Sequence, residues 1–176
     1  LKQLIGNPRL VIVGEPSSMQ VATGHKGKAA LKVTCHGQAG HSALAPQFVS
    51  AIHIAADFVQ QTRRLQNQLA AGPCDDAYSL PYSTVPIGKI TGGRALNIVP
   101  DTAQLDMEFR HLAQIPVQDI QSQIEAVAHQ VSRAYPLVPP ITVEAINTYP
   151  GLHIDASDKR VAWADSLAGH FGITKA

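Results

Sequence analysis

Apolar and polar residues alternate along two stretches of the chain, from Lys28 to His36 and from Thr102 to Leu112. Successive side chains of a β-strand point to opposite faces of a sheet, so this period of two predicts two strands with one buried and one solvated face each. The residues expected to face the core are Ala29, Leu31, Val33 and Cys35 in the first strand and Ala103, Leu105, Met107 and Phe109 in the second. Cys35 is therefore interpreted as a small buried hydrophobe.

Helical spacing of apolar residues predicts two helices, from about Gln47 to Ala71 and from Pro116 to about Tyr135. Two further strands are expected at Ser83 to Thr91 and at Ile141 to Ala145. The order strand, helix, strand, strand, helix, strand predicts an α+β fold of the ferredoxin-like βαββαβ type, a four-stranded antiparallel sheet with both helices on one face. An edge strand of such a sheet must be paired or covered, and a second copy of the chain would do both.

The two ends of the chain have a different pattern. Arg9 to Gly14 is a continuous apolar run, typical of a strand buried on both faces of a parallel sheet. Ser157 can cap an amphipathic helix from Asp158 to about His170. One strand and one helix cannot bury a core of their own, so we interpret them as pieces of a truncated α/β domain of a longer polypeptide. The expected division is residues 1–26 and 149–176 for that domain and 27–148 for the inserted one.

Composition excludes several classes of function. Of the 176 residues, 45% are apolar and 15% charged, which is enough to form a core, and the formal net charge is +1. Basic residues are scattered without an aromatic stripe, so no nucleic-acid partner is expected. No apolar run approaches the roughly 18 residues of a membrane span, so no membrane partner is expected either. The two cysteines are too few for a disulfide framework, which favours a reducing, cytoplasmic location.

Two residues carry side chains with catalytic chemistry. One lies in a loop of small residues and the other at the end of a predicted strand. His41 is carried by a glycine-rich loop between the first strand and the first helix, and an imidazole can donate a hydrogen bond or exchange a proton near neutral pH. Glu15 directly follows the apolar run at the N-terminus, and ligands of open α/β sheets bind at the carboxyl ends of strands. A solvated loop residue is the simpler interpretation of each.

A second glycine-led loop runs from Gly92 to Asp101 and contains Gly93 and Asn97. The strand that follows it places Arg110 on the solvated face of the sheet. A guanidinium at that position is expected to be available to an anion.

Four motifs then occur in one order: Val13-Gly14-Glu15-Pro16-Ser17, His25-Lys26-Gly27-Lys28, Gly37-Gln38-Ala39-Gly40-His41-Ser42, and Gly92-Gly93 with Asn97-Ile98-Val99-Pro100. Together they resemble the metallopeptidase family M20 over nearly the whole chain. Within that family, the loop after Gly72 and the stretch Pro81-Tyr82-Ser83-Thr84 look most like the acetylornithine deacetylases. Each motif alone is a weak signal, whereas four in one order form a strong one.

The resemblance implies a lid or dimerisation domain inserted into a catalytic domain that binds two divalent ions, zinc as a rule and cobalt as the alternative. Glu15 would be a ligand of one ion. His41 would reach across a homodimer into the partner's active site and donate a hydrogen bond to the developing oxyanion. Asn97 would hold the substrate on a loop shaped by Gly92-Gly93, and Arg110 would meet the substrate carboxylate.

The reaction that the resemblance implies is hydrolysis of the N-acyl amide of a small amino acid. N-acetylornithine and water would give ornithine and acetate, a step of arginine biosynthesis. The remaining metal ligands and the general base of the family lie outside this chain, so the isolated chain is expected to be metal-free and inactive.

Three alternatives stay open. The parent protein could be a succinyl-diaminopimelate desuccinylase or another M20 acylase or peptidase. The domain could be a purely structural dimerisation module, since a ferredoxin-like fold with an open sheet edge can serve assembly alone. A regulatory domain that binds a small ligand is a further option.

Overall fold

The computed structural model describes residues 6, 8, 11–14, 17 and 20–170, and the chain divides into two compact units. One unit comprises Lys26–Gly151. The other combines Leu1–His25 with Leu152–Ala176.

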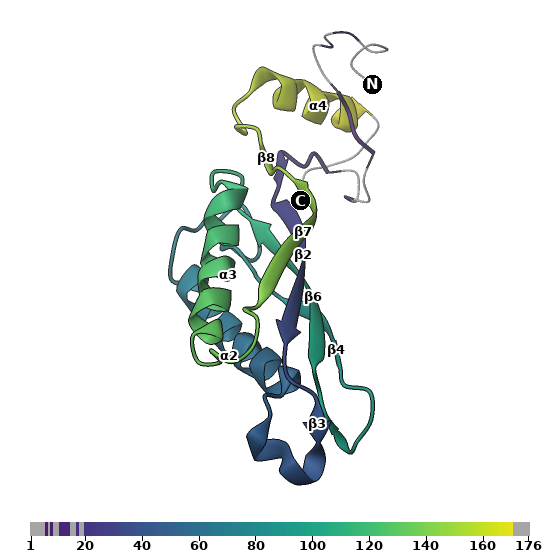
Figure 1. Cartoon of the computed structure of the whole chain (residues 1–176). Helices are drawn as coiled ribbons and strands as arrows, with labels where there is room; N and C mark the ends of the chain where they lie inside the picture. The colour runs from purple at the N-terminus through teal and green to yellow at the C-terminus, as the bar shows by residue number, and fades with distance from the viewer. Residues whose placement is uncertain (1–5, 7, 9–10, 15–16, 18–19, 171–176) are drawn as a thin grey trace. The chain divides into compact units, whose positions relative to one another are not determined.

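The larger unit is built on a four-stranded antiparallel sheet with two helices on one face (Figure 1). The strand order is β4-β6-β2-β7, which agrees with the expected α+β class and is consistent with a ferredoxin-like arrangement. The four strands are β2 (Gly27–His36), β4 (Ile87–Gly92), β6 (Thr102–His111) and β7 (Thr142–Tyr149).

The central pair of strands follows the alternation of the sequence. β2 and β6 pair without a register shift from Gly27 opposite His111 to His36 opposite Thr102. The eight residues predicted to face the core are all buried, none of them more than 3% exposed. Each core-facing side chain of one strand lies opposite one of the other, which gives the sheet a continuous apolar face for the helices to cover.

The helices pack on that face, but the first one begins later than the apolar spacing predicts. α2 spans Ala51–Ala70 and begins after Ser50, whose hydroxyl accepts a hydrogen bond from the His53 amide. The preceding residues Ser42–Gln47 form a separate 3₁₀ helix, η1. Extended backbone at Phe48 separates the two helices. The start of α2 is set by its capping serine, Ser50. α3 spans Val117–Ser132, close to its predicted bounds.

The outer strands also differ from the predicted bounds. On the β4 side, Thr84 forms only an isolated bridge with Arg110, and the regular strand begins after Pro86, which has no amide hydrogen for the ladder. On the other side, β7 extends to Tyr149, beyond the predicted end at Ala145. A register shift between Ala30 and Leu31 of β2 accommodates this longer strand.

In the smaller unit, β1 (Gly24–His25) pairs with β8 (Leu152–His153), and α4 spans Lys159–His170. The predicted buried strand at the N-terminus is wrong for the residues described there, since Val11, Ile12 and Val13 are 61–71% exposed and adopt no strand. A buried strand needs paired neighbours, and no described residue pairs with this stretch.

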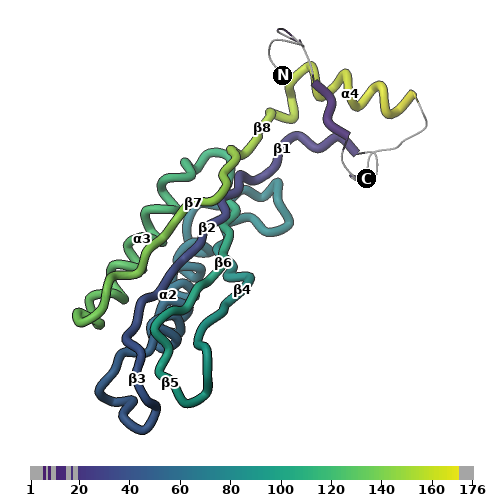
Figure 2. The backbone as a smooth tube through the Cα atoms, turned by 45° about the vertical axis from the view of Figure 1, so that its right-hand side comes forward, coloured from purple at the N-terminus to yellow at the C-terminus, as the bar shows by residue number. Residues whose placement is uncertain are grey.

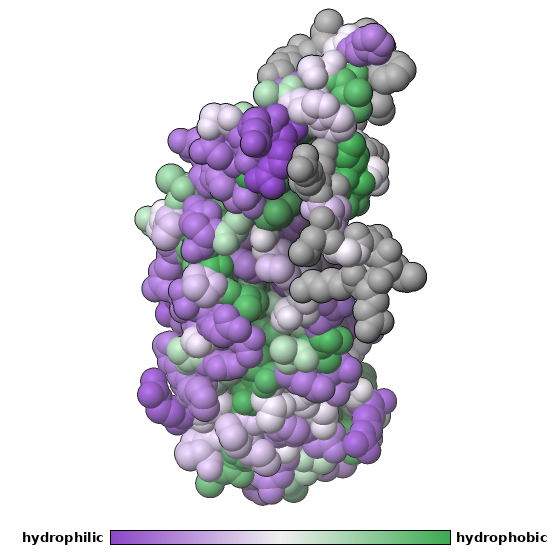
Figure 3. Space-filling view, turned by 90° about the horizontal axis from the view of Figure 1, so that it is seen from above, coloured by the Kyte–Doolittle hydropathy of each residue, from purple (hydrophilic) through white to green (hydrophobic). Residues whose placement is uncertain are grey.

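The cap of α4 differs from the prediction as well. The carboxylate of Asp158, rather than the hydroxyl of Ser157, accepts the Arg160 amide at the start of the helix. The Ser157 hydroxyl donates instead to Asp155. No helix in the described part of the chain is long and apolar enough to cross a membrane. On the surface shown in Figure 3, apolar side chains form separate patches among hydrophilic ones.

Candidate functional site

The two glycine-led loops meet at one end of the sheet (Figure 2). β3 (Gly40–His41) pairs antiparallel with β5 (Ile98–Val99), so that His41 lies opposite Ile98. The next amide, of Ser42, donates a hydrogen bond to the carbonyl oxygen of Asn97 over 3.0 Å. The backbones of Ser42 and Asn97, which lie more than fifty positions apart in the sequence, are therefore held side by side.

Three further backbone hydrogen bonds brace the loop that carries His41. The Gly37 amide donates to Asp101, the Gln38 amide to Val49 and the Ala51 amide to Pro100, at 2.7–2.9 Å. A β-carbon on Gly37 would lie 2.4 Å from the Val49 carbonyl oxygen, so a side chain does not fit there. The approach of three backbone segments thus explains why the loop needs glycine.

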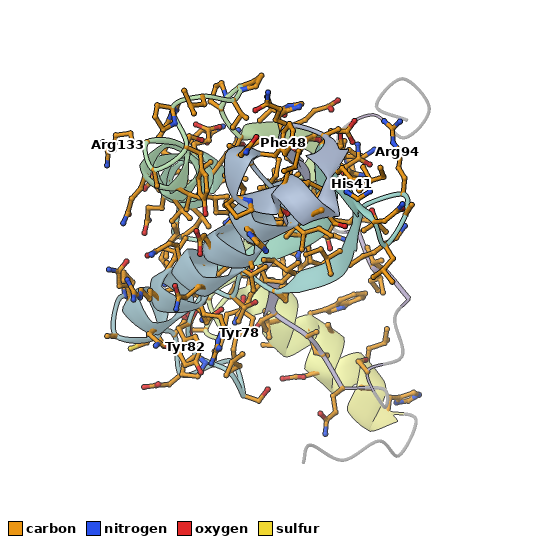
Figure 4. The ribbon with its side chains drawn as sticks, turned by 60° about the horizontal axis from the view of Figure 1, so that its bottom comes forward. His41, Phe48, Tyr78, Tyr82, Arg94 and Arg133 are labelled. Carbon is orange, nitrogen blue, oxygen red and sulfur yellow. The ribbon has the colours of Figure 1, made fainter. Side chains whose placement is uncertain are left out.

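The imidazole of His41 is exposed at the tip of this loop, and its Nδ1 accepts a hydrogen bond from the Ala43 amide over 3.1 Å. Figure 4 shows His41 and Phe48 on the same loop and Arg94 on the facing one. Arg94 forms an ion pair with Asp101 at 3.1 Å. This pair closes the loop that carries Asn97, although both partners are at least one-third exposed and the contact is worth little in free energy.

The pair Gly92-Gly93 shapes the start of the facing loop. Gly93 has a φ of +80°, a backbone conformation that residues with a side chain rarely adopt. A β-carbon on Gly92 would come within 2.9 Å of the β-carbon of Ala103 and 3.1 Å of Ile52. Both glycines are therefore required by the turn, and Asn97 lies exposed within the loop that they open.

Arg110 does not join His41 and Asn97 within one chain. It lies opposite Lys28, eight positions along β6 from the end at which the loops meet, roughly 26 Å at the rise of a strand. Its guanidinium donates to Glu108 over 3.0 Å and to the Tyr149 hydroxyl over 2.7 Å. The guanidinium is therefore not free, because Glu108 on the same strand and Tyr149 of β7 both accept its hydrogen bonds. Its role toward a substrate carboxylate stays a prediction.

Glu108 also forms an ion pair with Lys28 at 2.9 Å. The hydrogen bond from Lys28, together with the one from Arg110, lowers the pKa of the Glu108 carboxyl. Glu108 therefore stays ionised on the solvated face of the sheet and holds both cations.

Glu15 lies outside the described residues. Among the residues that the structure does describe, no group of three or more histidine, cysteine or acidic side chains could hold a metal ion. This part of the chain therefore does not fit a zinc site by itself.

Lys26 is a residue that the sequence pattern did not single out for a role. Its ammonium donates to the carbonyl oxygens of Leu80 and Tyr82, both over 2.6 Å, and lies 5.4 Å from the centre of the Tyr78 ring. Burial lowers its pKa, against the opposing effect of Asp75. Only the tertiary fold brings the loop with Leu80 and Tyr82 to Lys26. The sequence therefore offered no sign of these contacts beyond the place of Lys26 in the second motif.

These features define a particular class of α+β domain: a four-stranded sheet with an open edge, and two glycine-led loops joined at one end of it. The sequence model of the peptidase dimerisation domain of M20 peptidases matches residues 23–136, and the chain belongs to this family. Among curated proteins, it is 29% identical to the acetylornithine deacetylase of Proteus mirabilis, over 92% of this chain and 42% of that protein. It is 32% identical to the acetylornithine deacetylase of Salmonella arizonae, over 73% and 34%.

The fold is similar to that of solved M20-type enzymes. A tripeptidase from Staphylococcus aureus matches with a TM-score of 0.67 and 24% identity, over 89% of this chain and 38% of that one. The chain spans less than half the length of the curated relatives that it matches.

Proposed function

We propose that this chain is the lid and dimerisation domain of a metal-dependent amidohydrolase that removes the N-acetyl group from N-acetylornithine. The single observation that carries the proposal is the pairing of β3 with β5, which holds the exposed His41 opposite Ile98, against the loop that carries Asn97. Similarity to acetylornithine deacetylases along most of the chain supports the substrate class. Succinyl-diaminopimelate desuccinylase remains the nearest rival, and preference for a succinylated diamino acid would favour it.

The chemistry assigned to this domain is hydrogen-bond donation and substrate positioning. An acyl carbon attacked by water develops negative charge on its oxygen, and an N–H donor at that oxygen stabilises the transition state. His41 is the donor in this proposal, and Asn97 holds the substrate. The zinc ions would be bound elsewhere in the protein, with Glu15 as one ligand, since the described residues do not form such a site.

We further propose that the segments before Lys26 and after Gly151 belong to the catalytic domain. Two of their described features support this division: they form a compact unit of their own, and the side chains of Trp163 and Leu167 are exposed on α4 to 49% and 42%. Apolar side chains on a helix normally pack against another element.

Two unpaired cysteines agree with a reducing, cytoplasmic location.

The homodimer is proposed to form along the β4 edge of the sheet. Ile90 of β4 lies opposite the buried Leu105 and hence on the core side, yet it is 52% exposed. Ile52 of α2 is 39% exposed and lies beside Gly92-Gly93 on the same flank. A partner strand added here would cover both side chains and satisfy the open edge. It would also bring the loop with His41 close to the partner subunit.

The experiment that tests the catalytic role is His41→Ala in the full-length protein. Loss of an oxyanion donor is expected to lower kcat by about 10²- to 10³-fold, with the dimer mass unchanged. His53→Ala, the same substitution at an exposed position on α2, should leave kcat unchanged. Unaltered activity of His41→Ala with an intact dimer would favour the purely structural module. Saturable binding of an amino acid by the isolated chain in calorimetry would favour a regulatory domain.

A further inference from the structure

The imidazole of His41 makes an unusual helix cap. The Ala43 amide donates to its Nδ1, so that the ring caps η1 where oxygen atoms of Ser, Thr, Asp or Asn are the common acceptors. A ring nitrogen that accepts a hydrogen bond carries a lone pair. In the neutral ring the hydrogen is then on Nε2, because only one of the two nitrogens bears it.

A second contact fixes the backbone that carries the ring. The side chain of Phe48 lies directly over Gly40, the residue before His41, where a β-carbon would come within 2.2–2.4 Å of three atoms of the phenyl ring. The Phe48 amide donates to the Ala45 carbonyl oxygen over 3.1 Å and closes η1. Packing of the Phe48 ring on the bare backbone of Gly40 thus fixes the start of the loop that carries His41.

The opposite side of the same backbone is held by β5. Gly40 and His41 lie opposite Val99 and Ile98, and the Ser42 amide donates to Asn97. Since the backbone is held from two sides and Nδ1 is turned to the Ala43 amide, Nε2–H is the group that the exposed ring offers to a ligand. A donor fixed in this way costs no reorientation when it binds.

We propose that the Ala43 amide and the Phe48 ring are positioning elements that keep His41 in the Nε2–H form, as a dedicated hydrogen-bond donor to an acceptor oxygen. The side chain is then a donor rather than a general base, because a base would need its lone pair on Nε2. The ligand oxygen is the developing oxyanion if the proposed function holds, and the identity of the ligand rests on that function. The tautomer of His41 does not depend on the proposed function.

The test uses the 176-residue chain labelled with ¹⁵N and long-range ¹H–¹⁵N correlation spectra of its imidazole rings. His53 and His129, both exposed on helices, serve as internal references for an unconstrained ring. We expect His41 to show the Nε2–H pattern alone, whereas the references show averaged signals of both tautomers. An Nδ1–H pattern, or averaging equal to that of the references, would overturn the proposal.

Variants separate the positioning role from general stability. Ala43→Pro removes the donor and should bring the His41 signals to the averaged pattern, whereas Ala43→Gly keeps the amide and should leave them as in the wild type. Phe48→Ala should shift His41 toward the average, and Phe48→Leu, which keeps an apolar side chain over Gly40, should restore the pattern in large part. Core resonances of β2 and β6 report whether each variant is folded.

The outcomes distinguish this inference from the proposed function. An Nε2–H pattern in the chain combined with full activity of His41→Ala in the full-length protein would refute the catalytic role and leave the positioning intact. Identical His41 spectra in the wild type and a folded Ala43→Pro variant would refute the positioning, whatever the activity.

Discussion

The ring of His111 occupies the space that a β-carbon on Gly27 would need. That carbon would lie 2.0 Å from Nε2 of His111 and 2.7 Å from the amide nitrogen of Gly151. His111 is 3% exposed, its Nδ1 lies 3.0 Å from the Leu112 carbonyl oxygen, and within the described part of the chain its Nε2 has no hydrogen-bond partner. The start of β2 is thus packed against the ring at the end of β6 and against the backbone just after β7.

Gly27→Ala is therefore expected to destabilise the domain by about 1–3 kcal/mol, the usual cost of overpacking a filled interior. Urea unfolding followed by circular dichroism measures the change. Gly88→Ala is the matched control, because a β-carbon there would have its nearest neighbour at 3.8 Å. Adding His111→Ala to Gly27→Ala should recover only part of the loss, since the Gly151 amide stays in place. Equal stability of Gly27→Ala and the wild type would contradict the packing described.

The dimer edge can be tested with one substitution placed on each outer strand. Ile90 of β4 and Ile146 of β7 are exposed to 52% and 56%, so they form a matched pair. Ile90→Glu would bury a charge at the proposed interface and should raise the dissociation constant at least about tenfold, whereas Ile146→Glu should not. Light scattering after size exclusion distinguishes the 18.8 kDa chain from its dimer. The reverse result would move the interface to β7.

The two cysteines should differ in reactivity. Burial raises the pKa of the Cys35 thiol to about 11, so that almost no reactive thiolate is present at pH 8, and the side chain is also inaccessible. Cys74 is exposed. Iodoacetamide at pH 8 is expected to add one label to the native chain and two to the urea-unfolded chain, as mass spectrometry would show. Rapid labelling of Cys35 in the native chain would mean that β2 is not buried as described.

The carboxylate of Glu108, on the solvated face of the sheet, should make the stability of the folded chain depend on pH. The pKa of Glu108 is lowered in the folded chain, so its contribution to stability is complete above the pKa of an unfolded glutamate and is lost as the pH falls through the folded value. Glu108→Gln should cost less than about 1 kcal/mol at pH 7, since solvent screens a side chain that is 35% exposed.

Urea unfolding at a series of pH values measures this effect. The difference between the wild type and Glu108→Gln should shrink in the acid range below the ordinary pKa of glutamate. Asp106→Asn is the control, because Asp106 is 53% exposed and its contact with Lys89 is longer, at 3.8 Å. A difference between the wild type and Glu108→Gln that is constant down to the acid limit would show that the ion pairs with Lys28 and Arg110 do not stabilise the fold.

Several elements of the domain could be predicted from the sequence because their signals are local. The alternation in β2 and β6 gave their bounds to within one residue and identified their buried faces, since a period of two is a property of the strand itself. The start of α2 could not be placed from apolar spacing, because its cap at Ser50 outweighs the helical pattern of the residues before it. The N-terminal apolar run predicted a strand, but a strand requires partners that a local pattern does not reveal.

By itself, the sequence determined the four long strands and two long helices of the larger unit, which of their faces are apolar, and which loops are rich in glycine. Tertiary structure alone decided that His41 lies opposite Ile98 on the loop with Asn97, that Arg110 is engaged by Glu108 and Tyr149, and that the Ala43 amide meets the His41 ring. Periodicity is a local property of a chain, written in neighbouring residues. Contacts between distant segments, and the orientation of a side chain even toward a near neighbour, depend on strand register and loop geometry, which form only when the whole domain packs.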